Sequence, residues 1–182
     1  SEWLGLDWSP WLNLNDRQTL LSVLPRESGL YRVRHTGLPG ILYIGESGSE
    51  GGLRDRVGHG LAVGIGDHEP PQGGNHNATK ALWHIDETFQ GRLEVSAATP
   101  PSAANKQYRR ALEATLIAVA RREMDRTPDV LLNRDPIGDT DGGTLAEGRA
   151  DLPVKNNSFT VPDWQSWRMV ANADWMGYKW TD

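Results

Sequence analysis

The sequence predicts an α/β protein of the α+β kind, and two patterns carry this expectation. Residues 29–35 alternate apolar and polar side chains, residues 36–40 hold two glycines and a proline, and residues 41–44 are β-prone, as in a β-hairpin. Apolar residues at helical spacing flank this hairpin in several segments, and the longest such segment runs from about 102 to 126. With 182 residues, 37% of them hydrophobic, the chain can bury one ordinary core, so we expect one principal domain.

The other elements follow from local signals. Asn15 followed by Gln18 resembles a capping box and predicts a short helix that ends before Pro25. Leu53, Val57 and Leu61 repeat at four-residue intervals and predict a helix with a narrow apolar stripe. The remaining expected elements are a long loop at 64–77, a helix at 77–90, a third strand at 92–98, the long helix at 102–126 and a short strand at 130–132.

We divide the chain into an N-terminal extension with a short helix at 1–28, a central domain at 29–134 and a tryptophan-containing tail at 135–182. Seven of the eight tryptophans lie in the first eleven or the last nineteen residues. We expect the two termini to pack together as an aromatic layer, with base stacking or contact with a partner as the alternative.

Composition restricts the classes of function. The absence of cysteine excludes disulfides and thiolate metal sites. No stretch approaches the roughly 18 apolar residues of a membrane span, and no signal pattern opens the chain, so we expect a cytoplasmic protein without a membrane partner. The net charge of −5 argues against nucleic acid, but residues 102–134 hold seven basic residues against four acidic ones. Residues 135–182 hold eight acidic residues against four basic ones, so the excess negative charge lies mainly in the tail.

A carboxylate stands on the apolar stripe of the longest predicted helix. Glu113 lies three, four and seven positions before Leu116, Ile117 and Ala120, which places it on the same face as these residues. A buried carboxylate needs an arginine, a hydrogen-bond network or a cation to compensate its charge. A glutamate at the helix edge, paired with Arg109 or Arg110, is the simpler alternative.

Five short motifs then occur in a fixed order. They are Gly29-Leu30-Tyr31, Tyr43-Ile44-Gly45, Leu53-Arg54-Asp55-Arg56-Val57, Leu112-Glu113-Ala114-Thr115-Leu116-Ile117 and Asn133. No single motif is specific, but the ordered set on suitable secondary structure resembles the GIY-YIG nuclease superfamily over residues 29–133. Leu30 replaces the isoleucine of the first triplet, and Glu46 stands where many members have a lysine, which removes one group that could assist at the phosphate or the base.

The resemblance implies a GIY-YIG fold, a small three-stranded antiparallel sheet flanked by helices. It also implies a metal-dependent endonuclease that hydrolyses DNA phosphodiester bonds. Glu113 would be the sole protein ligand of Mg²⁺ or Mn²⁺, with water and phosphate completing the shell. Arg56 would clamp the scissile phosphate and stabilise the charge that develops during attack.

The resemblance gives the remaining site residues supporting roles. Tyr31 or Tyr43 would activate the attacking water, and because a phenol has a pKa near 10, a nearby cation or arginine must favour the phenolate. Of the two we prefer Tyr31. His59, three residues after Arg56 on the same helical face, is a candidate proton relay, and an ordinary surface histidine is the interpretation that we favour. Asn133 would brace the site by hydrogen bonds.

Basic side chains are expected to rim the site and to bind the nucleic-acid backbone: Arg32, Arg34, Arg54, Lys106, Arg109 and Arg110. The glycine-, histidine- and asparagine-rich loop and the tail favour restriction or another defence against foreign DNA, with RNA left open as a substrate. A homodimer is a further expectation, since cutting both strands often uses two copies. The alternatives are a nuclease of DNA repair or branched DNA, and a module that binds nucleic acid or another partner without cleaving.

Overall fold

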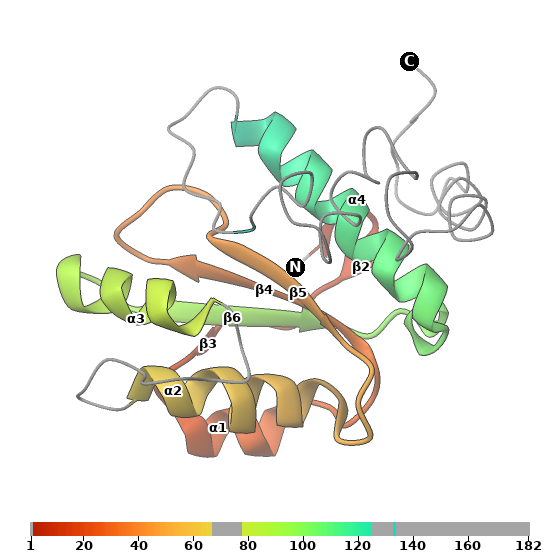
Figure 1. The fold of residues 1–182 in the computed structure, drawn as a ribbon, viewed down its shortest axis with the longest axis horizontal. Coiled ribbons are helices and arrows are strands. Elements are labelled where there is room, and N and C mark those ends of the chain that lie inside the picture. The colour runs from red at the N-terminus through yellow and green to blue at the C-terminus, as the bar shows by residue number, and fades with distance from the viewer. Residues whose placement is uncertain (1, 67–77, 125–132, 134–182) are drawn as a thin grey trace.

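The computed structural model describes residues 2–66, 78–124 and 133, which are coloured in Figure 1. The greater part of the expected loop at 64–77, the expected strand at 130–132 and the whole tail lie outside the described residues. The tail holds Trp164, Trp167, Trp175 and Trp180, so the expected layer between the two termini stays a prediction.

A four-stranded antiparallel sheet lies at the centre, in the order β3-β6-β4-β5. The predicted hairpin is confirmed as β4 (Gly29–His35) and β5 (Tyr43–Ser47), with Tyr31 opposite Gly45. The predicted third strand is β6 (Leu93–Ala98), which pairs with β4. The fourth strand, β3 (Leu12–Asn13), was not expected, because two residues are too short to show an alternating pattern.

The N-terminal region folds onto the sheet. β1 (Glu2–Trp3) and β2 (Leu6–Asp7) form a separate hairpin, whose turn residues Leu4 and Gly5 both have positive φ, 56° and 68°. The strain at Leu4 is offset by burial of its side chain in the core. The predicted short helix is α1 (Arg17–Val23), but its cap is Asp16 rather than Asn15. The Asp16 carboxylate accepts hydrogen bonds from the backbone N–H and the hydroxyl of Thr19.

The remaining helices lie where the sequence predicts them, but the type of the helix after Leu53 differs from the prediction. The expected helix from Leu53 is a π-helix, η1 (Arg54–Leu61), which continues as α2 (Ala62–Gly66). The other helices are α3 (Thr79–Thr88), a 3₁₀ turn η2 (Pro101–Ala104) and α4 (Lys106–Met124). No helix in the described part of the chain is both long enough and apolar enough to cross a bilayer.

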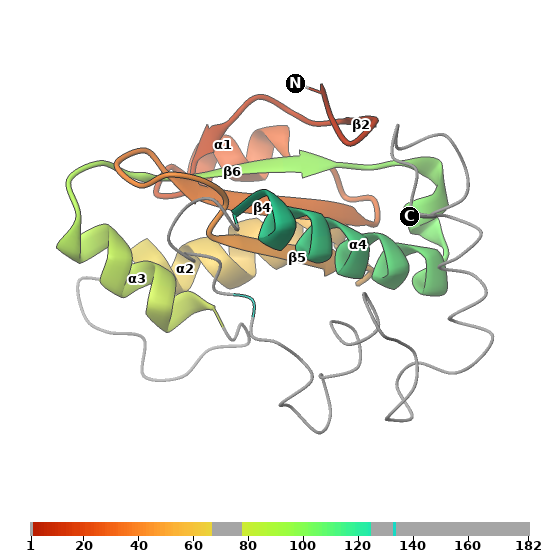
Figure 2. The ribbon, with the colours of Figure 1, turned by 90° about the horizontal axis from the view of Figure 1, so that it is seen from above.

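The sheet lies between helices on its two sides (Figures 1 and 2), and one hydrophobic core lies on each side of it. Helices α1, α2 and α3 with η1 pack on one face, where Tyr31 and Val33 of β4 point. Helix α4 and the N-terminal hairpin cover the other face, where Leu30 and Ile44 point. The alternation along β4 therefore serves both cores, and β5 remains at the edge of the sheet.

Candidate active site

The two tyrosines of the motifs meet at the edge strand. Tyr31 on β4 and Tyr43 on β5 have ring centroids 6.1 Å apart. Tyr31 lies opposite Gly45, and a Cβ on that glycine would overlap the Cζ and the hydroxyl of the Tyr31 ring. The glycine of the second triplet thus lets the Tyr31 side chain extend across β5. Both hydroxyls reach one region at the sheet edge.

Arg56 and Glu113 join the tyrosines from opposite faces of the sheet. Arg56 comes from η1 and donates a hydrogen bond to Tyr31, while Tyr31 hydrogen-bonds to Tyr43. Glu113 comes from α4, and its charge acts on both tyrosines. We call Tyr31, Tyr43, Arg56 and Glu113 the edge cluster. The structure therefore brings together four residues that span more than eighty positions of the chain.

Burial makes both tyrosines weak acids. Burial, and secondarily the charge of Tyr43, raises the pKa of Tyr31 well above 10, although Arg56 opposes the shift. Burial, followed by the charge of Glu113, raises the pKa of Tyr43 to about 12, while Arg56 and the hydrogen bond from Tyr31 lower it. Tyr31 is fully buried, whereas Tyr43 is partly exposed. Tyr43 is therefore the more accessible phenol, and it accepts a hydrogen bond from Tyr31, which itself accepts one from Arg56.

Glu113 has no ion-pair partner among the described residues to compensate its charge when the carboxyl is ionised. Its neighbours Leu112, Leu116 and Ile117 are buried, and its own carboxyl is half-buried. Burial, followed by the charge of Glu46, raises the pKa of Glu113 to about 8, although nearby arginines lower it. Within the described residues, no hydrogen bond or ion pair reaches this carboxylate.

Such a carboxylate has the chemistry of a hard cation site. Oxygen is the ligand that Mg²⁺ and Mn²⁺ prefer, and a cation would compensate the charge that the protein leaves unpaired. The described residues contain no group of three or more acidic or histidine side chains that could form a complete metal cage. Most of a bound ion's shell would then come from water and substrate oxygens. Glu113 fits a one-ligand site of this kind.

Asn133 is bound to the edge strand. Its side-chain oxygen accepts a hydrogen bond from the backbone N–H of Ile44, and its side-chain nitrogen donates to the carbonyl of Ile44, both at 2.8 Å. Ile44 stands between Tyr43 and Gly45, so Asn133 fixes the backbone that carries the second triplet. The bracing role expected of Asn133 stays a prediction.

Two residues of the arginine motif's helix point elsewhere. His59 is exposed, its Nδ1 lies 3.0 Å from the Arg17 guanidinium, and its Nε2 lies 4.0 Å from Asp55. Arg54 donates through Nε to the carbonyl of Leu24 at 2.8 Å. Both side chains thus contact groups outside the edge cluster.

Two further arginines of the expected rim lie in an aromatic cluster on the α4 face of the sheet. Arg32 is buried, and its Cζ lies 5.2, 4.4 and 4.7 Å from the ring centroids of Trp3, Trp8 and Trp11. The Cζ of Arg34 lies 4.2 Å from the ring centroid of Trp11. Burial and the charge of Arg34 lower the pKa of Arg32 to about 10. Glu94 pairs with Arg34 at 2.7 Å and with Arg92 at 2.9 Å. We call this set the tryptophan–arginine cluster: Trp3, Trp8, Trp11, Arg32, Arg34, Arg92 and Glu94.

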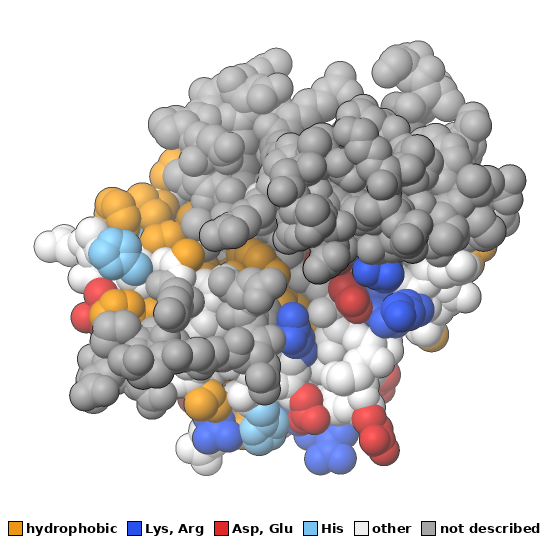
Figure 3. Space-filling view, viewed as in Figure 1, with side chains coloured by type: hydrophobic (Ala, Val, Ile, Leu, Met, Phe, Trp, Pro, Cys, Tyr) orange, Lys and Arg blue, Asp and Glu red, His pale blue; other side chains and the backbone are white. Residues whose placement is uncertain are grey.

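The last three basic residues of the expected rim begin helix α4. Arg109 is buried and pairs with Glu46. Lys106 is exposed and Arg110 half-exposed, and the charge of Arg110 lowers the pKa of Glu113. On the face drawn in Figure 3, basic and acidic side chains lie next to one another rather than in separate fields.

Two features of the site could not be predicted from the sequence. Glu46 acts on both Glu113 and Tyr43, although the sequence suggested only that a lysine was missing there. Its place directly after the second triplet was the available signal. The π-helical form of η1 gave no signal, since the spacing of Leu53, Val57 and Leu61 suits an ordinary helix as well.

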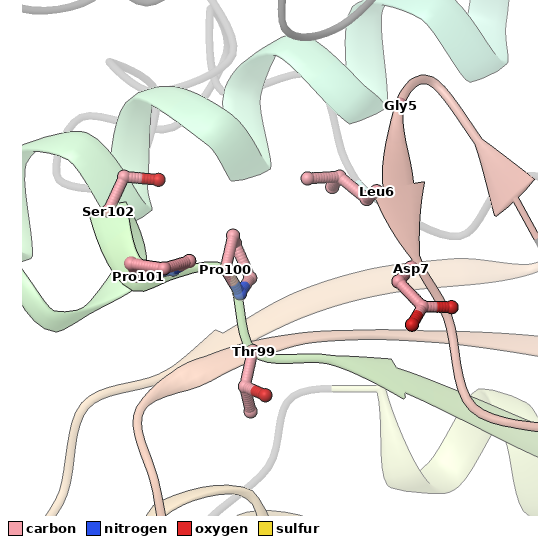
Figure 4. Close-up of a pocket in the computed structure, with 7 residues that line it drawn as sticks. All are labelled: Gly5, Leu6, Asp7, Thr99, Pro100, Pro101 and Ser102. Atoms are coloured by element: carbon pink, nitrogen blue, oxygen red, sulfur yellow. The ribbon is translucent and has the colours of Figure 1, made fainter.

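A surface pocket lies apart from these groups (Figure 4). It is lined by Gly5, Leu6, Asp7, Thr99, Pro100, Pro101 and Ser102, between the N-terminal hairpin and the segment that leads into α4. Asp7 is the one titratable residue in this lining, and no cation there could bind a phosphate. The edge cluster is therefore the stronger candidate site.

Comparison with known proteins adds no identification: no family model, no curated protein and no solved structure matches the chain.

Proposed function

We propose that the protein is a metal-dependent endonuclease of the GIY-YIG type that hydrolyses DNA phosphodiester bonds at the edge cluster. One observation carries the proposal: two tyrosines, an arginine and a carboxylate without an ion-pair partner in the described chain meet at one point of the sheet edge. A role in restriction or other defence against foreign DNA is the proposed setting.

Each residue of the edge cluster has a different chemical role. Arg56 presents a permanently charged fork to the phosphate oxygens and stabilises the charge that develops as water attacks. Tyr43, as the phenolate, would take the proton of that water, because it is partly exposed and accepts a hydrogen bond from Tyr31. Since its pKa is about 12 without metal, the charges of Arg56 and of a bound cation would have to favour the phenolate. Tyr31 orients Tyr43 and links it to Arg56. The difference in burial thus favours Tyr43 as the base, whereas the sequence analysis preferred Tyr31.

Glu113 would hold Mg²⁺ or Mn²⁺, which supplies positive charge against the phosphate when bound. Around it, Lys106 and Arg110 extend from α4 as contacts for the nucleic-acid backbone. The remaining arginines of the expected rim, Arg32, Arg34, Arg54 and Arg109, are engaged by other groups of the protein.

The test uses two glutamates in matched variants. Glu113→Gln keeps the side-chain shape and removes the charge that holds the cation, whereas Glu94→Gln changes a glutamate of the tryptophan–arginine cluster. Plasmid, phage and branched DNA, and RNA, are incubated with each protein and Mg²⁺ or Mn²⁺. We expect Glu113→Gln to lower the cleavage rate at least about 10³-fold, and Glu94→Gln to leave it within about twofold.

Binding assays complete the test. Glu113→Gln should bind DNA as wild type does without metal, and the affinity should fall steeply with salt, because bound counterions are released. Wild-type protein that cleaves none of these substrates, or a Gln variant that cuts as fast as wild type, would contradict the proposal. DNA binding without cleavage would then favour the non-cleaving module.

A further inference from the structure

Arg109 connects three segments at the start of α4. Its side chain is buried, its Nε donates to the Glu46 carboxylate, and its Nη1 donates to the carbonyl of Ala103 at 2.8 Å. The guanidinium also lies against Gly48, where a Cβ would overlap it. These contacts join η2, α4 and the end of β5. A side chain held in this way is not directed at solvent.

The connection lies next to the edge cluster on both elements. Arg109 stands four residues before Glu113, so the two side chains share one face of α4. Glu46 follows directly after Tyr43-Ile44-Gly45 on β5. The Arg109–Glu46 ion pair is therefore a direct link between the helix that carries Glu113 and the strand that carries Tyr43. Separating the partners of a largely buried ion pair is costly, because each charge is then left uncompensated. The pair therefore holds α4 and β5 at a fixed distance.

We propose that Arg109 and Glu46 are positioning residues that hold the Glu113 carboxylate beside Tyr43, and that Arg109 is not a nucleic-acid contact. This inference rests on the proposed function, because it concerns the geometry of the same metal site. It separates Arg109 from Arg110, its half-exposed neighbour on the same helix. The ion pair sets the distance from α4 to β5, and Glu113 supplies the ligand.

Metal affinity tests the inference, because two explanations predict opposite signs. If Arg109 acted only through its charge, Arg109→Met would make the site more negative and would tighten binding of Mn²⁺. If Arg109 positions Glu113, the same variant weakens binding even though a positive charge is lost. Residues that orient a metal ligand typically contribute about 10–100-fold to metal affinity.

The experiment titrates Mn²⁺ alone into the full chain and follows the bound ion by electron paramagnetic resonance. The proteins are wild type, Arg109→Met, Arg109→Lys, Glu46→Gln and the double variant Arg109→Met with Glu46→Gln. Glu94→Gln is the matched control, because it breaks an Arg–Glu pair elsewhere on the sheet. Circular dichroism checks that each variant is folded, and Arg109→Lys keeps the charge if the Met variant unfolds.

We expect Arg109→Met to weaken Mn²⁺ binding at least about tenfold, Arg109→Lys to recover part of the loss, and Glu94→Gln to change it less than about twofold. The double variant should be no weaker than the poorer single variant, because each residue acts through the other. DNA binding without metal should be unchanged in Arg109→Met.

Two failures are distinguishable. If wild type binds no Mn²⁺, both the proposed function and this inference are overturned. If wild type binds Mn²⁺ and loses it in Glu113→Gln, but Arg109→Met binds as tightly or more tightly, only the positioning role is overturned. Weaker DNA binding by Arg109→Met, with Mn²⁺ affinity unchanged, would make Arg109 a backbone contact instead.

Discussion

The edge cluster and the tryptophan–arginine cluster use the same residue types in opposite electrostatic states. In the tryptophan–arginine cluster, Glu94 lies between two arginines, and although burial raises its pKa, hydrogen bonds from Arg34 and Arg92 lower it by more. In the edge cluster, burial and Glu46 raise the pKa of Glu113 to about 8, and no ion pair within the described residues compensates it.

The difference shows how a site can be told from a structural network. A charge that its neighbours neutralise stabilises the fold and has little capacity left for a ligand. A charge that is desolvated beside a second carboxylate costs stability, and proteins retain such groups mainly where they bind or react.

The largest effect in the edge cluster beyond Glu113 itself should come from Arg56. Arg56→Ala should lower the cleavage rate about 10²–10³-fold and weaken DNA binding, because one fixed cation serves both steps. Single-turnover cleavage and binding titrations measure the two effects. Arg32→Met, the matched change in the tryptophan–arginine cluster, should leave the rate per folded molecule unchanged, and an equal loss in both variants would remove the distinction.

The two tyrosines should differ. Tyr43→Phe removes the proposed base and should lower the single-turnover rate about 10²-fold. Tyr31→Phe removes one hydrogen bond to that base and should cost no more than about tenfold, the value of about 1.4 kcal/mol. If Tyr31→Phe is the more damaging variant, the assignment reverses and Tyr31 takes the proton.

The stability of the metal-free protein should depend on pH through Glu113. Its folded pKa of about 8 lies above the ordinary 4.5, so the folded state favours the protonated carboxyl. Stability should therefore be unaffected below about pH 4.5 and should fall as pH rises toward 8. Glu113→Gln should be more stable than wild type by roughly 3–5 kcal/mol above pH 8 and equal to it at pH 4. Urea unfolding across this range measures the difference, and parallel curves would contradict it.

The smallest effect should come from Glu94, with the opposite sign. Its folded pKa is lowered, so its contribution is present above the unfolded pKa and is lost as pH falls through the folded value. Glu94→Gln should therefore flatten the acid side of the stability profile and leave the alkaline side unchanged. Urea unfolding over the same pH range measures this effect. A change in stability confined to alkaline pH would show that the Glu94 carboxylate is not stabilised by its arginine partners.

The sequence was sufficient to predict the elements with a clear hydrophobic period. The hairpin of β4 and β5, the strand β6 and the helix α4 follow from alternation and helical spacing, because side chains on one face must meet one core. It also determined that Glu113 stands on the apolar stripe of α4, since position along a helix fixes its face.

Tertiary structure decided which charges are compensated. Arg32, Arg34 and Arg109 were all expected to bind nucleic acid, yet each meets a tryptophan or a glutamate brought from a distant segment. The two-residue strand β3 and the π-helical turns of η1 likewise depend on partners rather than on local pattern. Burial and charge pairing are properties of contacts between distant segments, so a local pattern can name the residues of a site but not their electrostatic state.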